Sequence, residues 1–138
     1  MDNVFEFPAG LYGFPDLKRF VVVDVPGAGD VVKQLVSTED PNVGFTLVFP
    51  FAFFPRYSPD IPEEELVAVG AESAEQVLLY AIASVPEDFW KATANLRAPV
   101  LFNPFTRKGR QVILGDDRYG IREPLFQGAD RIPAEEGR

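Results

Sequence analysis

The sequence predicts an all-β protein, a small antiparallel β-barrel of meander type with little helix. Thirteen prolines are spread over 138 residues, and an interior proline removes a helical hydrogen bond and clashes with the preceding turn. Between the prolines and glycines lie short runs rich in β-branched and aromatic residues, which are typical of barrels and sandwiches. The length suits a single hydrophobic core. We therefore expect one domain over residues 1–126, followed by a polar tail over residues 127–138 that frays.

The first half of the chain contains four predicted strands, at residues 4–7, 20–25, 32–38 and 45–49. Turn-forming, glycine-bearing segments at 9–15 and 27–30 separate the first three. The run at 20–25 is almost continuously apolar, which predicts a strand buried on both faces. At 45–49, large apolar residues occupy every second position, which is the period of a half-buried strand.

Residues 50–62 combine four prolines with a cluster of aromatic rings, so neither a regular strand nor a helix is expected there. The rings are Phe51, Phe53, Phe54 and Tyr57. They either pack under the domain or face a partner, and packing against the core is the commoner outcome. The acidic run at 63–65 predicts a solvated patch, with the first turn of a helix as the alternative, because acidic side chains suit a helix N-terminus. Residues 66–69 are expected to form a strand.

The next stretch carries both helix and strand signals. Ser73 and Gln76 have the spacing of a helix-capping box, whereas the apolar run that continues to Val85 favours a buried strand. We expect a single turn followed by a strand. The loop at 86–91 carries the only tryptophan of the chain, which we expect to cover the core. A last short strand is expected at 121–123.

Two apolar runs, at 100–102 and 112–114, predict a β-hairpin. A short, basic, glycine-bearing connection that includes residues 107–109 lies between them. Asn95 and Asn103 bracket the first run. Their side-chain amides can satisfy exposed backbone groups or bend the chain, so we expect both to hold the hairpin in place.

The chain contains no cysteine and no histidine. This absence excludes disulfides, thiolate nucleophiles, zinc sites built on Cys or His, and every catalytic triad that uses imidazole as its base. No phosphate-binding glycine motif or calcium-loop spacing occurs. We therefore expect a protein that is not an enzyme and that uses no cofactor or metal.

No apolar run approaches the roughly 20 residues that a membrane-spanning helix needs. The chain also does not open with the basic segment and apolar run of a secretory signal. A chain without cysteine is compatible with a reducing compartment. We expect a cytoplasmic protein that makes no membrane contact.

The net charge is −8 and is unevenly distributed. Residues 39–90 carry ten acidic side chains against Arg56 alone, whereas residues 91–131 carry eight basic side chains against four acidic ones. An acidic protein is repelled by phosphate backbones and attracted to basic partners. The simpler alternative is that the acidic residues serve only to keep the protein soluble.

The basic C-terminal third supports one alternative function. Small β-barrels bind single-stranded nucleic acid through cations and interleaved aromatic rings. The hairpin over residues 97–118 has this composition, and Arg97, Arg110 and Tyr119 would be the contact residues. The overall negative charge and the lack of a ribonucleoprotein-type aromatic motif weigh against this alternative.

The run from Thr93 to Asn103, followed by Gly109 to Leu114, resembles the signature of the flagellar assembly factor family FliW. The segments at 10–14, 37–50 and 53–57 resemble further motifs of the family, so the likeness extends over most of the chain. It implies an all-β, cytoplasmic, non-enzymatic protein. It further implies a partner switch, in which the protein binds the translational regulator CsrA and stops it from repressing flagellin synthesis, and also binds flagellin itself.

The resemblance and the charge pattern together suggest the residues that contact partners. Acidic side chains would attract the basic regulator, aromatic rings would supply apolar contact, and two amides would hold the hairpin. The predicted residues are Glu39, Asp40, Glu63, Glu64, Glu65, Phe53, Phe54, Tyr57, Asn95 and Asn103. Only six residues precede Phe7, fewer than in most of the family. The first strand is therefore expected to be short, which leaves two outcomes open: a closed barrel, or one that is incompletely closed at this strand.

Overall fold

The structure is a computed structural model and describes residues 3–126. Within that range the strands are β1 (Val4–Glu6), β2 (Arg19–Asp24), β3 (Val32–Ser37), β4 (Gly44–Val48), β5 (Leu78–Ser84), β6 (Thr93–Ala94), β7 (Val100–Asn103), β8 (Lys108–Gln111) and β9 (Glu123–Pro124). The short helices are α1 (Pro50–Phe53) and α2 (Glu63–Ala68), and the 3-10 turns are η1 (Ala74–Gln76) and η2 (Phe89–Lys91). The tail predicted over residues 127–138 lies outside the described residues.

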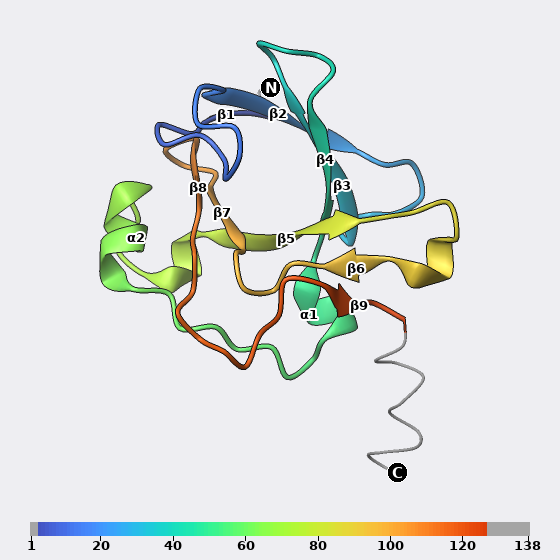
Figure 1. Cartoon of the computed structure of the whole chain (residues 1–138). Coiled ribbons are helices and arrows are strands. Elements are labelled where there is room, and N and C mark those ends of the chain that lie inside the picture. The colour runs from blue at the N-terminus through green and yellow to red at the C-terminus, as the bar shows by residue number, and fades with distance from the viewer. Residues whose placement is uncertain (1–2, 127–138) are drawn as a thin grey trace.

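The strands form a closed barrel (Figure 1). In the part of the chain that the structure describes, seven of them pair around a ring in the order β4, β3, β2, β1, β8, β7 and β5, and β5 pairs back to β4. Strands β6 and β9 extend the sheet beyond β5. The predicted fold class, a small and largely antiparallel barrel, is confirmed.

Barrel closure depends on the short strand β1. It pairs with β2 in antiparallel fashion and with β8 in parallel fashion, through Glu6 and Lys108. The Glu6 amide also donates a hydrogen bond to the Arg107 carbonyl, at 2.8 Å. A three-residue first strand is therefore sufficient, and incomplete closure, one of the two outcomes left open by the short N-terminus, does not occur.

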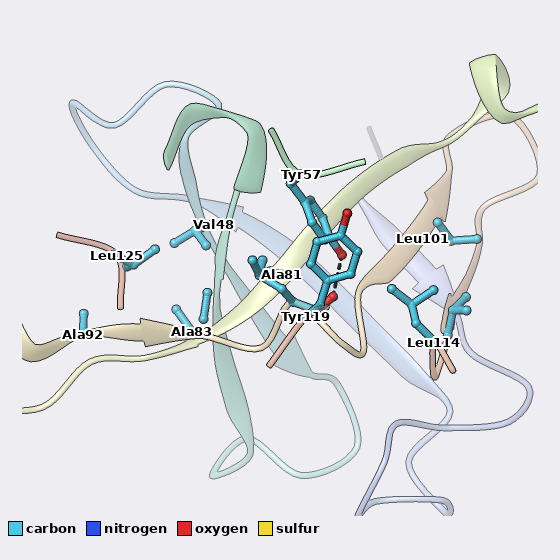
Figure 2. Close-up of a cluster of buried hydrophobic side chains, with 12 residues drawn as sticks. Val48, Tyr57, Ala81, Ala83, Ala92, Leu101, Leu114, Tyr119 and Leu125 are labelled. Carbon is cyan, nitrogen blue, oxygen red and sulfur yellow. Dashed lines mark hydrogen bonds between the residues drawn. The ribbon is translucent and has the colours of Figure 1, made fainter. Parts of the chain in front are cut away.

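Two hydrophobic clusters lie on opposite faces of the same strands. Alternate residues of a strand point to opposite faces, so Leu47 and Tyr80 face the barrel interior, whereas Val48 and Ala81 face an outer cluster. The outer cluster is covered by the proline-rich segment after α1 and by the C-terminal segment (Figure 2). All four residues of β7 are buried for the same reason.

The prediction that residues 20–25 are buried on both faces is wrong. In β2, Phe20 is fully buried, but Val23 is 43% exposed. A closed barrel has one interior, and among residues 3–126 the outer cluster includes no residue of β2. An apolar run alone cannot distinguish the covered strands from the uncovered ones.

The strand predicted at 66–69 is also wrong, because residues 66–68 complete helix α2 and Val69 is its C-cap. The alternative for the acidic run, a helical first turn, is the observed structure, and its carboxylates lie at the positive end of the helix. Leu66 and Val69 are spaced three apart and both turn inward. Residues 50–53 likewise form the short helix α1, which tolerates Pro50 because it stands in the first turn.

The hairpin is present, but its second strand begins earlier than predicted. The turn occupies residues 104–107, and β8 begins at Lys108. Gly109 is therefore a strand residue, and a Cβ at this position would collide with the Phe7 ring. Val112 and Leu114 lie beyond β8, although their amides still donate to the carbonyls of residues 99 and 97.

Candidate protein-binding surfaces

Helix α2 presents an acidic outer face. Glu63 and Glu64 are exposed, and within residues 3–126 neither side chain forms an ion pair or a hydrogen bond. Val67, one turn further on, is 65% exposed. Residues three and four apart share one side of a helix, so these three side chains form one surface, which we call the acidic helix face (Glu63, Glu64 and Val67). The helix lies at one side of the barrel (Figure 1).

The opposite side of α2 is fixed to the barrel. The Glu65 carboxylate accepts a hydrogen bond from Nε of Arg110 on β8 and forms an ion pair with it. At the end of the helix, the Val69 carbonyl accepts from Nδ2 of Asn103 at 2.9 Å and from Oγ1 of Thr106 at 2.7 Å. The acidic helix face is therefore held on a rigid support. Glu65 belongs to that support rather than to the free surface.

The other two predicted acidic residues are engaged within the chain. Oε1 of Glu39 accepts the backbone amides of Lys18 and Arg19, at 2.7 and 3.2 Å. Oδ1 of Asp40 accepts the amide of Asn42 at 3.1 Å, within a tight turn. These carboxylates stabilise loops at the β2 and β3 ends, so their negative charge is less available to a partner. Their predicted partner contact stays a prediction.

Tyr57 is a core residue. It is 4% exposed, its ring meets the Tyr119 ring edge-on with centroids 4.8 Å apart, and its hydroxyl donates to the Leu96 carbonyl at 2.7 Å (Figure 2). Burial raises the pKa of the Tyr57 phenol well above its ordinary value, and the neighbouring Tyr119 adds to the rise. Phe53 and Phe54 are half-buried against the same cluster. The expectation that these rings pack against the core is confirmed for all three.

The two predicted asparagines hold the backbone of the hairpin. Oδ1 of Asn95 accepts the amides of residues 97 and 98, at 3.1 and 3.0 Å. Oδ1 of Asn103 accepts the amides of Phe105 and Thr106, and its Nδ2 reaches α2. Asn103 is 1% exposed, so any part it takes in partner binding is exerted through the position of α2.

An exposed aromatic surface lies on the other side of the molecule, and of its residues the sequence analysis identified only Phe53. Trp90 is 67% exposed and Phe89 is 54% exposed, so the expectation that the tryptophan covers the core is wrong. Both rings pack on Phe126, with centroids 4.8 and 5.1 Å away, and Phe53 meets Phe126 at 6.2 Å. We call these four residues the aromatic patch. The sequence did contain a signal for this exposed surface, namely two adjacent large aromatic residues in a polar loop. Two such neighbouring side chains rarely fit into a hydrophobic core together.

The residues proposed for nucleic-acid contact are engaged within the chain. Nε of Arg97 donates to the Tyr119 carbonyl and its Nη2 pairs with Asp117, Arg110 pairs with Glu65, and Arg118 pairs with Asp116. Tyr119 itself is 9% exposed. The arrangement therefore gives no support to the alternative of a single-strand nucleic-acid barrel built on Arg97, Arg110 and Tyr119.

The part of the chain that the structure describes contains neither a metal-binding cluster nor a membrane-spanning helix. No group of three or more acidic, histidine or cysteine side chains is placed to hold a metal ion there. No helix among these residues has both the length and the apolar character to cross a bilayer.

Comparison with known proteins decides the family. The model of the family described as "FliW protein" matches residues 1–125. The chain belongs to the FliW family. It is 99% identical over 138 residues, all of both chains, to the flagellar assembly factor FliW of Symbiobacterium thermophilum. It is 40% identical over 126 residues to the FliW of Syntrophomonas wolfei, covering 91% of this chain and 80% of the relative.

A solved structure supports the same assignment. The crystal structure of the flagellar assembly factor FliW matches with a TM-score of 0.83 and 33% identity, covering 89% of this chain and 85% of the other. The predicted family resemblance is thereby confirmed. These FliW relatives carry the name of a flagellar assembly factor.

Proposed function

We propose that this member of the FliW family acts in the cytoplasm as an antagonist of a CsrA-type translational regulator, and so relieves repression of flagellin synthesis. The observation that carries the proposal is the acidic helix face, where two carboxylates without a partner within residues 3–126 stand on a rigidly held helix in a chain of net charge −8. An RNA-binding regulator must present positive charge to RNA. Complementary charge speeds the encounter of two proteins and fixes their orientation.

The aromatic patch supports a second contact, with flagellin. Exposed aromatic residues are enriched at the centres of protein interfaces, where they contribute most of the binding energy. The patch lies at the far end of β5 from α2 (Figure 1). The seven residues of β5 span roughly 23 Å at about 3.3 Å per residue, so the two surfaces are separate. In the partner switch, flagellin competes with the regulator for this protein.

A displacement assay tests the regulator contact. A fluorescent flagellin leader RNA is bound to the purified regulator, and its anisotropy is followed as this protein is added. The anisotropy should fall to that of free RNA, and the protein alone should leave free RNA unchanged. Salt-sensitive binding of the protein to RNA itself would overturn the proposal and favour the nucleic-acid alternative.

Paired variants test the flagellin contact. Truncation of a central interface tryptophan typically costs about 2 kcal/mol or more, so Trp90→Ala should weaken flagellin binding roughly thirtyfold while leaving regulator binding intact. Glu63→Lys with Glu64→Lys should do the reverse. If both variants weakened the same partner equally, the assignment of one partner to each surface would be wrong.

A further inference from the structure

An apolar cavity opens at one mouth of the barrel. Its volume is about 460 Å³, which is within the range of roughly 300–1,000 Å³ found for small-molecule sites. The mouths of β-barrels are a preferred location for such sites. Its apolar wall comes from Phe5, Val22, Leu47, Leu78, Tyr80 and Phe102. These residues belong to five of the barrel strands, so the wall is part of the rigid frame rather than of a loop.

The wall is apolar, and among its six residues Leu78 is the one that is exposed. Leu78 is 50% exposed although it lies in β5, paired with Phe102 of β7. The Tyr80 hydroxyl is not free, because it donates to the Asp30 carbonyl at 2.8 Å. The inner wall therefore offers hydrophobic contact to a ligand.

The rim carries two cations and two carboxylates, but they are unevenly paired. Nζ of Lys33 is held between the carboxylates of Asp24 and Asp30, at 2.7 and 3.1 Å. Arg107 forms no ion pair with any residue from 3 to 126. Its guanidinium carbon lies 5.5 Å from the centre of the Phe5 ring. The rim is thus formally neutral, but the Arg107 guanidinium beside the apolar wall has no carboxylate partner within residues 3–126.

Arg107 has an unusual backbone conformation for an arginine. Its φ is +62°, the only positive φ of a non-glycine residue within the described range. A left-handed conformation costs a non-glycine residue roughly 1 kcal/mol. The structural duties of the position, a carbonyl that accepts from Glu6 and an amide that donates to Asn103, would be met equally by glycine. Barrel closure therefore gives no reason for an arginine side chain here.

We propose that the barrel mouth binds a small amphipathic monocarboxylate. Its carboxylate pairs with the Arg107 guanidinium, whose planar fork suits two parallel hydrogen bonds to a carboxylate. Its hydrocarbon tail lies against Phe5, Leu47 and Phe102. A dianionic phosphate fits less well, because the rim offers one free cation and Asp30 stands nearby. The site shares no residue with the acidic helix face or the aromatic patch, so the proposal is independent of the proposed function.

To test the proposal, the full-length protein is titrated with decanoate. A parallel titration uses decanol, an uncharged probe of equal chain length. Both probes are kept below the concentrations at which they aggregate. Backbone amide shifts in the NMR spectrum locate binding. Decanoate should shift the amides of Val22, Leu78 and Phe102 saturably, with one equivalent bound, and decanol should bind at least tenfold more weakly. No saturable shift at the mouth, or saturation at other residues, would overturn the proposal.

Two variants separate the charge from the cavity. Arg107→Gly should fold, because glycine suits the left-handed backbone at this position. It should reduce the affinity for decanoate to that for decanol. Arg122→Gly, which removes a distant exposed arginine, is the matched control and should leave decanoate affinity unchanged. Leu78→Trp should fill the mouth and weaken both probes. Unchanged decanoate binding in Arg107→Gly would overturn the proposal. The proposal would also be overturned if the regulator or flagellin, but not decanoate, shifted the amides at the barrel mouth. The mouth would then be a protein-docking surface.

Discussion

At the scale of single residues, Gly109 sets how closely β8 approaches the barrel interior. Its missing side chain leaves room for the Phe7 ring, which is fully buried and stacks edge-on with Phe20 and Phe102. Gly109→Ala should therefore lower the free energy of unfolding by about 2–3 kcal/mol through overpacking. Urea denaturation measures this loss. Gly115→Ala, where no atom lies within 4 Å of the added Cβ, should change stability by less than about 0.5 kcal/mol; equal effects would contradict the packing role.

Tyr57 predicts a pH dependence of stability. Burial raises its pKa in the folded protein, so above the unfolded value of about 10 the folded state retains a proton that the unfolded chain loses. The stabilisation is complete below pH 10 and is lost as the pH rises further, with a slope of about 1.4 kcal/mol per pH unit. The raised pKa of Tyr80 adds to the same trend.

Tyr57→Phe should therefore make the loss of stability between about pH 10 and 12 shallower, as measured by denaturation at a series of pH values. At neutral pH the variant should cost about 1 kcal/mol, because the Leu96 carbonyl loses its donor. Tyr12→Phe is the control, since Tyr12 is 82% exposed. Parallel pH profiles for all three proteins would show that Tyr57 titrates normally.

At the scale of elements, Asn103 joins the hairpin turn to helix α2. Its buried amide forms three hydrogen bonds, two within the turn and one to the Val69 carbonyl. Asn103→Ala should lower the free energy of unfolding by about 2–3 kcal/mol, because it removes three hydrogen bonds of a fully buried side chain. It should also speed hydrogen exchange in α2. Asn42→Ala, in an exposed turn, should do neither, and intact protection of α2 in the Asn103 variant would refute this link.

The sequence predicted most strands but misjudged the elements whose structure depends on distant residues. Local sequence was enough to predict two regions: the strand with apolar residues at every second position at 45–49, and the turn followed by a strand after Ser73. Both predictions are confirmed, by β4 and by η1 with β5. Residues 66–69 were not predictable in this way, because a short apolar run fits either a strand or a helix. Helix α2 is fixed by Arg110, which lies 45 residues from Glu65.

The candidate site was predictable only in part for the same reason. The charge pattern and the family resemblance identified Glu63 and Glu64, which form no ion pair or hydrogen bond within residues 3–126, together with Glu39 and Glu65, which are engaged by backbone amides and by Arg110. Sequence spacing cannot show which carboxylates are already satisfied within the fold. The aromatic patch depends on Phe126 meeting Trp90 across the chain, which is likewise a tertiary contact.

At the scale of the whole molecule, the closed barrel acts as a rigid frame that separates two surfaces of different chemistry. The acidic helix face stands at one end of β5 and the aromatic patch at the other (Figure 1). The frame itself carries the mouth cavity between β1 and β7. A small protein can thus meet a basic partner and an apolar one without rearranging its core.

The association rate with the CsrA-type regulator, measured by stopped flow at a series of salt concentrations, tests the central claim most directly. Glu63→Lys with Glu64→Lys should slow association roughly tenfold at low salt and flatten its salt dependence, because the steering charge is reversed. Asp16→Lys with Glu87→Lys makes the same change in net charge at exposed positions outside α2 and should slow association much less. Equal slowing by the two double variants, or no slowing by the first, would contradict a regulator contact at the acidic helix face.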